Sequence, residues 1–370
     1  GGNFTDWEDA GNIASIGYPI AEISSDGSCI TTKPAGTGGI VSVGTVSEQM
    51  LYEIGDPQHY ILPDVICDFS DVTLQQIGDN RVQVSAAKGR AAPDSYKTCL
   101  TYADGFRAGT FMTFYGAAAE RKADSLAQAA LTRARSTLKL FGLGDFTDVN
   151  FEVIGAGRQM GESRTANEVV IKVAVKHADM RGVGIFLKEL SGLGLATPPG
   201  LSGFTGAGRP RPSPVVRLFS YLTPKSALAV TIDVDGTVMN HADTTCVRTT
   251  FAARPDEPKP VKGTVDVPLI KLAWGRSGDK GNKANVGIIA RKPEYLPYIW
   301  AALSEEITAK VFAHFMDSPN AVERFYLPGS HAINFLIDDV LGGGGAASLR
   351  NDAQAKGYAQ VLLATSVPVS

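Results

Sequence analysis

The stretch with the densest potential for chemistry is residues 276–285, Arg-Ser-Gly-Asp-Lys-Gly-Asn-Lys-Ala-Asn, which lies between two apolar segments. A plain hairpin needs only about two to five connecting residues, so a run this long and this polar indicates a site. We expect Asp279 and Lys280 to act as an acid/base pair on a carbonyl substrate. Ser277 and Asn282 are suited to hold an oxyanion. The alternative is a solvated loop closed by its own Asx turns.

A second candidate is the glycine-rich loop at residues 33–39, Lys-Pro-Ala-Gly-Thr-Gly-Gly. Glycines let several backbone N–H groups converge on an anion, and Lys33 and the start of the next helix add positive charge. The loop is not a Walker A motif, because no Gly-Lys-Ser or Gly-Lys-Thr follows, and its glycines do not form a GxGxxG fingerprint. The alternative is a tight strand-to-helix turn.

The third candidate is the four-glycine run at residues 342–345, followed by Ala-Ala-Ser-Leu-Arg. Four glycines in a row cost conformational entropy on folding, which close approach to a ligand or to another backbone would justify. A flexible connector is the alternative interpretation. The residues that we predict to bind substrate are Lys33, Gly36, Thr37, Gly38, Gly39, Arg276, Gly343, Gly344 and Arg350.

Other catalytic and metal-binding patterns have little support in the sequence. Asp6 and Glu22 are candidate paired carboxylates, but spacing alone does not show a pair, so a structural role is favoured. The five histidines are isolated, without HxH or HExxH, so we predict no metal site. No GxSxG nucleophile elbow is present, while a Ser/His/Asp triad stays open because its order along the chain is free. We expect no redox cofactor, since no dinucleotide motif is found.

The elements around these motifs follow from local patterns. Two β-type runs flank Asp26-Gly27, which predicts a hairpin, and a capping box from Thr45 to Glu48 predicts a helix over residues 48–55. Further expected elements are strands at 96–102, 107–114, 149–154 and 168–176, and helices at 117–141, 178–190 and 293–315. Strands at 267–274 and 284–290 are expected to flank the polar 276–285 loop.

Composition bounds the class of protein. With 370 residues, 44% hydrophobic and 20% charged, the chain is globular and long enough for two domains. The Pro- and Lys-rich segment 253–265 is predicted to be a linker between a main domain, 1–252, and a domain at 266–370. We therefore expect an α+β protein with a mixed main sheet and a smaller C-terminal α+β sandwich of ferredoxin-like type.

Charge and cysteine usage exclude several partners. A net charge of −3 without basic runs argues against nucleic acid or an anionic membrane, and no apolar stretch is long enough to span a bilayer. The four cysteines form no CxxC pair, so we expect reduced, mostly buried thiols and a cytoplasmic protein.

Long strings of this sequence resemble the acyclic terpene utilisation (AtuA-like) family. The strings, in chain order, are GGNFTDW, GYPIAEI, DGSCITTKPAGTGG, TVSEQMLYEIGDPQHYILPDV, SGDKGNKANVGIIARKPEYLP and LGGGGAASLR. The resemblance spans almost the whole chain and implies an α/β main domain followed by a ferredoxin-like domain from about residue 266. It carries over no agreed catalytic residues.

The same resemblance implies a role in the catabolism of citronellol- and geraniol-type terpenes through CoA thioesters. We therefore expect an enzyme of hydratase, lyase or hydrolase type that acts on a branched acid or acyl-CoA, with CoA as part of the substrate. Family members usually have a segment before the position of Gly1, which a cleaved piece or a separate chain would supply. A homo- or hetero-oligomer is thus expected. The alternative function is a non-catalytic subunit that organises a multi-chain enzyme, and a small-molecule sensor is a weaker third.

Overall fold

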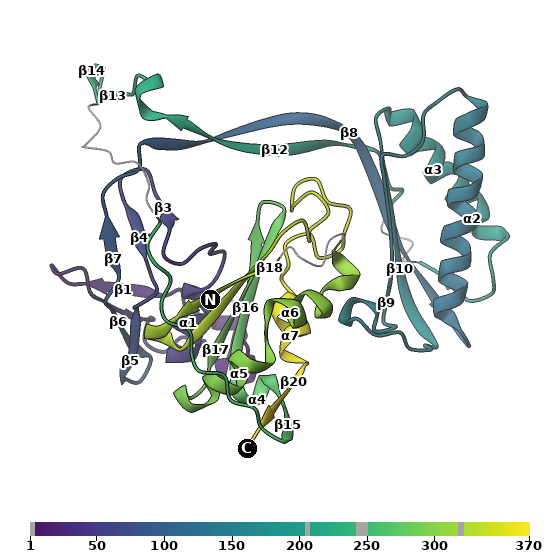
Figure 1. The fold of residues 1–370 in the computed structure, drawn as a ribbon. Coiled ribbons are helices and arrows are strands. Elements are labelled where there is room, and N and C mark those ends of the chain that lie inside the picture. Colours follow the sequence, from purple (N-terminus) through teal and green to yellow (C-terminus); the bar gives the residue numbers. More distant parts are fainter. Residues whose placement is uncertain (1–3, 204–207, 242–250, 317–321) are drawn as a thin grey trace. The chain divides into compact units, whose positions relative to one another are not determined.

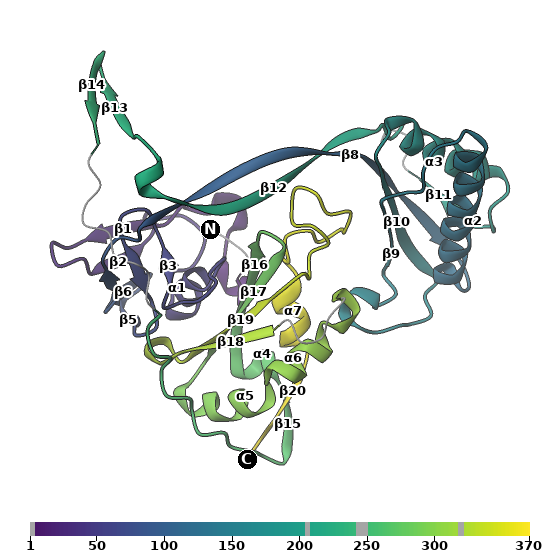
Figure 2. The same cartoon turned by 45° about the horizontal axis from the view of Figure 1, so that its top comes forward.

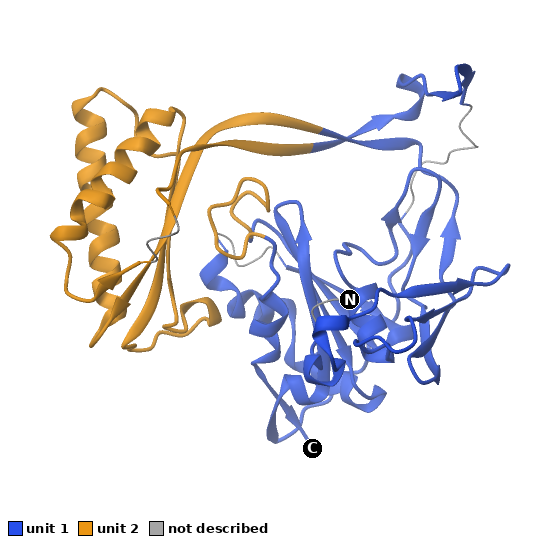
Figure 3. Cartoon of the chain, turned by 180° about the vertical axis from the view of Figure 1, so that it is seen from behind, with its two compact units in different colours: residues 1–99, 220–340, 354–370 blue, residues 100–219, 341–353 orange. Residues whose placement is uncertain are grey.

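The computed structural model describes residues 4–203, 208–241, 251–316 and 322–370. The chain forms two compact units (Figure 3): unit 1 is residues 1–99, 220–340 and 354–370, and unit 2 is residues 100–219 and 341–353. Each unit combines segments that are far apart in the sequence, whereas the predicted domains are consecutive blocks. The prediction of a mixed α+β fold is confirmed.

The ferredoxin-like part of unit 1 is an antiparallel sheet in the order β16-β17-β19-β18. Helices α6 and α7 pack on one face of this sheet, and α1 packs on the other (Figure 2). The bounds are α1 Val43–Met50, β16 Ala273–Lys280, β17 Lys283–Ala290, α5 Leu296–Ala302, α6 Glu305–Val311, β18 Val322–Leu327, β19 Ala332–Ile337 and α7 Tyr358–Leu363. Two further short strands, β15 (Val265–Pro268) and β20 (Ser366–Val369), form an antiparallel pair. Helix α4 (Leu269–Leu272) follows β15 directly.

Helix α1 begins earlier than the sequence pattern suggested. Its capping box joins the side chain of Ser42 to the backbone of Thr45, so the expected start at residue 48 is wrong. Glu48 is therefore inside the helix, where its carboxyl group is free to bond elsewhere. The expected single helix at 293–315 is also wrong, because Ser304 caps a new helix, α6, directly after α5.

Two small antiparallel sheets complete most of unit 1. The first has the order β1-β2-β6-β5, and the second β3-β4-β7. The predicted hairpin at Asp26-Gly27 is confirmed, because β1 and β2 pair across it and Gly27 adopts φ +86°. The bounds are β1 Ile20–Ile23, β2 Cys29–Thr32, β3 Tyr60–Ile61, β4 Ile66–Asp68, β5 Thr73–Gly78, β6 Arg81–Ser85, β7 Lys88–Arg90, β13 Thr231–Val234 and β14 Thr237–Asn240.

Unit 2 is a sheet covered by two helices. Strands β11, β8, β10 and β9 lie side by side, β12 pairs with β8, and α2 and α3 cover one face (Figure 1). Alternation on β10 sends Ile171, Val173 and Val175 into this helix-covered core. The bounds are β8 Ser95–Tyr115, α2 Ala119–Leu140, β9 Asp148–Ile154, β10 Glu168–His177, α3 Met180–Gly192, β11 Leu201–Ser202 and β12 Ser213–Pro224.

Strand β8 is one strand where the sequence predicted two. The strands expected at 96–102 and 107–114 are continuous through Asp104 and Gly105. A Cβ at Gly105 would lie 2.6 Å from the carbonyl oxygen of His177, so glycine here allows β10 to approach closely instead of turning the chain.

The cysteines differ in part from expectation. Cys29, Cys67 and Cys99 are free thiols, but the first two are half-buried and the third is exposed, so the prediction of mostly buried thiols is wrong for them. Cys246 lies outside the described residues. In the segment expected to be a linker, residues 253–264 contain neither helix nor strand.

Candidate functional site

The polar stretch 276–285 forms two paired strands where a long loop was expected. Strands β16 and β17 pair from Ala273–Ala290 to Lys280–Lys283, so only Gly281 and Asn282 form the turn. Gly281 has φ +69°, which suits glycine in a tight connection. Polar residues are accommodated in these strands because both faces of the sheet meet other polar groups of unit 1.

Strand geometry divides the predicted catalytic residues between two faces, because successive side chains point in opposite directions. On the α7 side, the Ser277 hydroxyl donates to Ala355 O at 2.6 Å and accepts from Ala359 N at 2.8 Å. Alternation places Asp279 on this face as well, and Lys280 on the other. Asn282, at the turn, donates to Asp339 Oδ1 at 2.9 Å. The structure therefore does not bring Asp279 and Lys280 together at one point.

The face of β16 toward α1 carries a cluster of cations around tyrosine rings. The Arg276 Cζ lies 4.2 Å from the centroid of the Tyr52 ring, and the Lys280 Nζ lies 5.4 Å from that of Tyr60. Lys356 donates a hydrogen bond to the Tyr52 hydroxyl. We refer to Arg276, Lys280, Lys356 and Tyr52, together with Glu53, as the Tyr52 cluster.

Charge and burial set the protonation of the two lysines in the Tyr52 cluster. Burial, and then the neighbouring charge of Lys97, lower the pKa of Lys280. Burial also acts to lower the pKa of Lys356, but its hydrogen bond to Tyr52 and the charge of Glu53 outweigh burial and raise that pKa. The Lys356 Nζ lies 3.4 Å from Glu53 Oε1. Lys356 is therefore the more firmly protonated of the two.

Two buried asparagines of the sheet hold the Tyr52 cluster in place. Asn285 accepts from Glu53 N at 2.8 Å and donates to Leu51 O at 2.6 Å. Asn334 donates to Ile54 O and Gly55 O, and accepts from Asn285. These bonds secure the turn after α1, in which Glu53 has φ +58°, a conformation that a non-glycine residue adopts at a cost.

Sequence reasoning identified Arg276 and Lys280 but missed Tyr52, Glu53 and Lys356. Tyr52 and Lys356 are 304 residues apart, so no local spacing signals their contact. The sequence feature that indicates a close approach to β16 is Gly278. A Cβ at this position would lie 2.6 Å from a Tyr52 ring carbon and 2.8 Å from Glu53 Cγ. A glycine inside a strand often marks such an approach.

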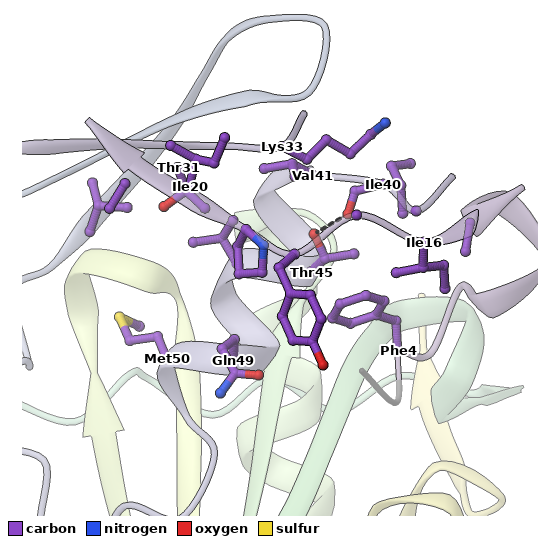
Figure 4. A pocket seen from close by; sticks show the side chains of 18 of the residues that line it. Phe4, Ile16, Ile20, Thr31, Lys33, Ile40, Val41, Thr45, Gln49 and Met50 are labelled. Carbon is purple, nitrogen blue, oxygen red and sulfur yellow. Dashed lines mark hydrogen bonds between the residues drawn. The ribbon is translucent and has the colours of Figure 1, made fainter. Parts of the chain in front are cut away.

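An apolar pocket of about 750 Å³ lies elsewhere in unit 1, between α1 and the segments that precede it (Figure 4). Among the described residues that line it, Lys33 is the only one with a formal charge at neutral pH. The other lining residues are Phe4, Trp7, Ala10, Ile13, Ile16, Gly17, Tyr18, Pro19, Ile20, Ala21, Cys29, Thr31, Gly39, Ile40, Val41, Thr45, Val46, Gln49, Met50 and Val84. Such a lining suits a largely hydrocarbon ligand.

The 36–39 loop borders this pocket, and several of its polar groups already bond to backbone carbonyls of the protein. Gly38 N donates to Ser15 O at 3.0 Å, and Gly39 N donates to Ala10 O at 2.6 Å. The Lys33 Nζ donates to Thr37 O at 2.5 Å, while Gly36 turns the chain with φ +74°. Lys33 and Gly39 therefore contribute to the pocket wall, whereas the amides of Gly38 and Gly39 bond to backbone carbonyls.

The loop at 341–353 belongs to unit 2. Gly342, Gly343 and Gly344 all have positive φ, and a Cβ at Gly343 would lie 3.4 Å from a guanidinium nitrogen of Arg217. Arg107 donates to Ser348 O at 2.9 Å. A Cβ at Gly342 would lie 3.2 Å from the Nε of Arg350. This glycine run is thus packed against arginine side chains of its own unit.

The candidate carboxylate pair is not formed. Asp6 binds Arg291 Nη2 at 2.6 Å and Trp274 Nε1 at 2.6 Å, whereas Glu22 pairs with Arg81.

Glu48 is a different case, because it is fully buried and burial raises its pKa to about 7. No cluster of metal-ligating side chains occurs within the described ranges.

Comparison with known proteins identifies both parts of the chain. Residues 1–234 match the acyclic terpene utilisation family protein AtuA, and residues 267–368 match the AtuA ferredoxin-like domain. No curated protein and no solved structure matches the chain. No helix in the part of the chain that the structure describes is long and apolar enough to cross a membrane.

Proposed function

Because the chain belongs to the AtuA family, which is associated with acyclic terpene utilisation, we propose that it binds and transforms an acyclic, branched carboxylic acid or its CoA thioester. The reaction would be of hydratase, lyase or hydrolase type. The observation that carries this proposal is the apolar pocket of about 750 Å³ in unit 1. Its volume lies within the range of about 300–1,000 Å³ that is usual for small-molecule sites.

The lining of the pocket supports a hydrocarbon ligand with one polar end. Isoleucine, valine and aromatic side chains offer dispersion contacts along a branched chain, with no buried charge to desolvate. Lys33 at the wall is the group that would face a carboxylate or thioester oxygen. Thr31, Thr45 and Gln49 add neutral polar atoms that would orient this end.

The proposed chemistry uses the residues predicted from the sequence in two roles. Lys280 and Arg276 share the α1-facing side of β16, so we propose them as the groups that meet the reacting or anionic part of the substrate. Asp279, Ser277 and Asn282 are proposed to hold the hairpin in position. Gly343, Gly344 and Arg350, in unit 2, remain a proposed substrate contact of that unit.

Binding of geranic acid tests the proposal directly. Val46 and Val43 are both half-buried on α1, but only Val46 lines the pocket. We expect Val46→Phe to fill the pocket and weaken geranic acid binding about tenfold, whereas Val43→Phe should leave it unchanged. Calorimetric titration of both variants would measure this. If wild type does not bind, or if Val46→Phe binds as wild type does, the proposal is wrong.

A non-catalytic role in a multi-chain assembly is the second candidate. The observation that favours it is the large number of exposed apolar side chains on strand β12 and on the β13–β14 hairpin. Such surfaces are typical of protein interfaces. Turnover of geranic acid or its CoA thioester by the purified chain alone would exclude this candidate.

A further inference from the structure

We propose that the apolar pocket of unit 1 is built for an acyclic isoprenoid acid of about 15 to 20 carbons, longer than geranic acid. The carboxylate or thioester end of this substrate would lie at Lys33, and the end of its hydrocarbon chain at Phe4 and Trp7. This inference rests on the proposed function, and it adds the length of the substrate chain and the direction of that chain in the pocket.

The first argument is the size of the pocket, which has a volume of about 750 Å³. A water molecule takes about 30 Å³ in the liquid, so this space corresponds to about 25 non-hydrogen atoms. Geranic acid has about 12 such atoms and would leave about half of the space to water. Farnesoic and geranylgeranoic acids have about 17 and about 22, so the volume favours these longer acids.

The N-terminal segment, residues 4–17, forms one wall of the pocket and gives the second argument. At the start of this segment, the backbone amide of buried Thr5 donates to the carboxyl group of Glu48 on α1 at 2.9 Å. Phe4 and Trp7, on either side of Thr5, both line the pocket. The start of the wall is therefore apolar and is fixed against α1.

The end of the same wall lies against the loop that begins with Lys33. The backbone amide of Gly17 donates to the carbonyl oxygen of Gly38 in that loop at 3.3 Å. Figure 4 shows Lys33 and Phe4 on different sides of the pocket. A substrate whose charged end meets Lys33 therefore reaches Phe4 and Trp7 only if its chain is long.

The hydrogen bonds of the Lys33 loop indicate which end of the substrate it receives. An ammonium group carries three N–H donors, and Lys33 uses one of them on Thr37 O. The remaining capacity suits a carboxylate or a thioester oxygen, which only accept. The nearby amide of Gly39 is already bonded to Ala10 O at 2.6 Å, so the charged end is assigned to Lys33 rather than to the loop backbone.

Several large apolar side chains of the pocket lining are exposed, which is the third argument. The exposed fractions are 59% for Trp7, 64% for Ile13 and 84% for Tyr18. A short ligand could contact the buried lining residues Ala10 and Val41, but it would leave this exposed surface in water. A longer chain would cover part of the surface, and the gain in affinity grows with the apolar area removed from water.

Calorimetric titration with geranic, farnesoic and geranylgeranoic acids would test the chain length. We expect farnesoic acid to bind at least about tenfold more tightly than geranic acid, because each added isoprene unit takes about five further carbons out of water. Geranylgeranoic acid should bind at least as tightly as farnesoic acid.

A variant at the far end of the pocket tests the direction of the chain. Trp7→Gln changes an exposed side chain, and we expect about tenfold weaker binding of geranylgeranoic acid but a change of less than about twofold for geranic acid. The matched control is Phe141→Gln, because Phe141 is 66% exposed just after α2, in unit 2. This control should bind all three acids as wild type does.

A variant at the other end should affect the three acids equally. Lys33→Gln removes the charge that meets the end common to all of them, so we expect about tenfold weaker binding of each. Unchanged binding in Lys33→Gln would show that the charged end lies elsewhere, and the assigned direction would then be wrong.

The outcomes separate this inference from the proposed function. Binding of none of the three acids would remove the proposed function itself. Binding of geranic acid with no gain from farnesoic acid would overturn the inference on chain length alone. A gain with length that persists undiminished in Trp7→Gln would also overturn it, because that would show a general affinity of long acids for apolar surfaces.

Discussion

The carboxyl group of Glu48 on α1 accepts hydrogen bonds from both the backbone amide and the hydroxyl of Thr5, with no exposure to solvent. Its Oε1 takes part in both bonds, whereas Oε2 is buried without a hydrogen-bond partner. An ionised carboxylate would leave that second oxygen desolvated, so the neutral acid is favoured. Glu48 thus joins the N-terminal segment to α1 as a protonated group at mildly acidic pH.

Stability should therefore fall as pH rises through the titration of Glu48. The pKa is raised from 4.5 to about 7 in the folded protein, so the folded state binds more protons than the unfolded state between these values. This shift corresponds to about 3 kcal/mol of unfolding free energy, present below pH 4.5 and lost by about pH 7.

The comparison with Glu48→Gln isolates this effect from other titrating groups. The difference in unfolding free energy, wild type minus variant, should decrease by about 3 kcal/mol between pH 4.5 and about pH 8. Urea denaturation at a series of pH values would measure it. Parallel pH profiles for the two proteins would contradict the assignment.

Asp6 should show the opposite pH dependence. Its pKa is lowered, chiefly by the hydrogen bond from Arg291, so its stabilisation is present above the unfolded pKa and is lost as pH falls. Because the pair is partly exposed, we expect Asp6→Asn to cost about 1 kcal/mol near neutral pH and progressively less as the pH falls below 3.8. Asp9→Asn, at an exposed position nearby, serves as the control for denaturation at each pH.

Local sequence patterns correctly predicted helix α2 and strand β10, whose periodic apolar residues bury one face of each element. The polar run at 276–285 was assigned to a loop, since no local rule shows that Ser277 would bond to the backbone at Ala355 and Ala359. Once the run is a strand, Asp279 and Lys280 point to opposite faces.

The contacts that define the Tyr52 cluster could not be predicted from spacing. Asn285 on β17 donates to Asn334 on β19, both asparagines bond to the backbone around the turn after α1, and Lys356 reaches the Tyr52 hydroxyl from a third segment. Such a contact depends on the packing of three separate segments. The strained φ of Glu53 is likewise a consequence of tertiary structure, because a glutamate has no local preference for it.

Removal of the Asn285 side chain should destabilise the protein strongly. Asn285→Ala would leave the buried Glu53 N–H and Leu51 carbonyl without their partner, at a cost of about 3 kcal/mol. Asn282→Ala is the matched control, because Asn282 is on the same hairpin and its bond to Asp339 is exposed, so the loss should be below about 1 kcal/mol. Equal melting temperatures for the two variants would contradict the clamping role of Asn285.

The last prediction concerns Gly278, whose missing side chain makes room for Tyr52. In Gly278→Ala, the new Cβ would lie 2.6 Å from the Tyr52 ring and 2.8 Å from Glu53, so the turn must move away from β16. We expect a loss of about 1–3 kcal/mol in unfolding free energy from this overpacking. Gly184→Ala is the control, since its Cβ would meet nothing within 4 Å and helix α3 should gain up to about 1 kcal/mol. Thermal denaturation would measure both, and an unchanged or raised melting temperature in Gly278→Ala would show that Tyr52 does not rest on this strand.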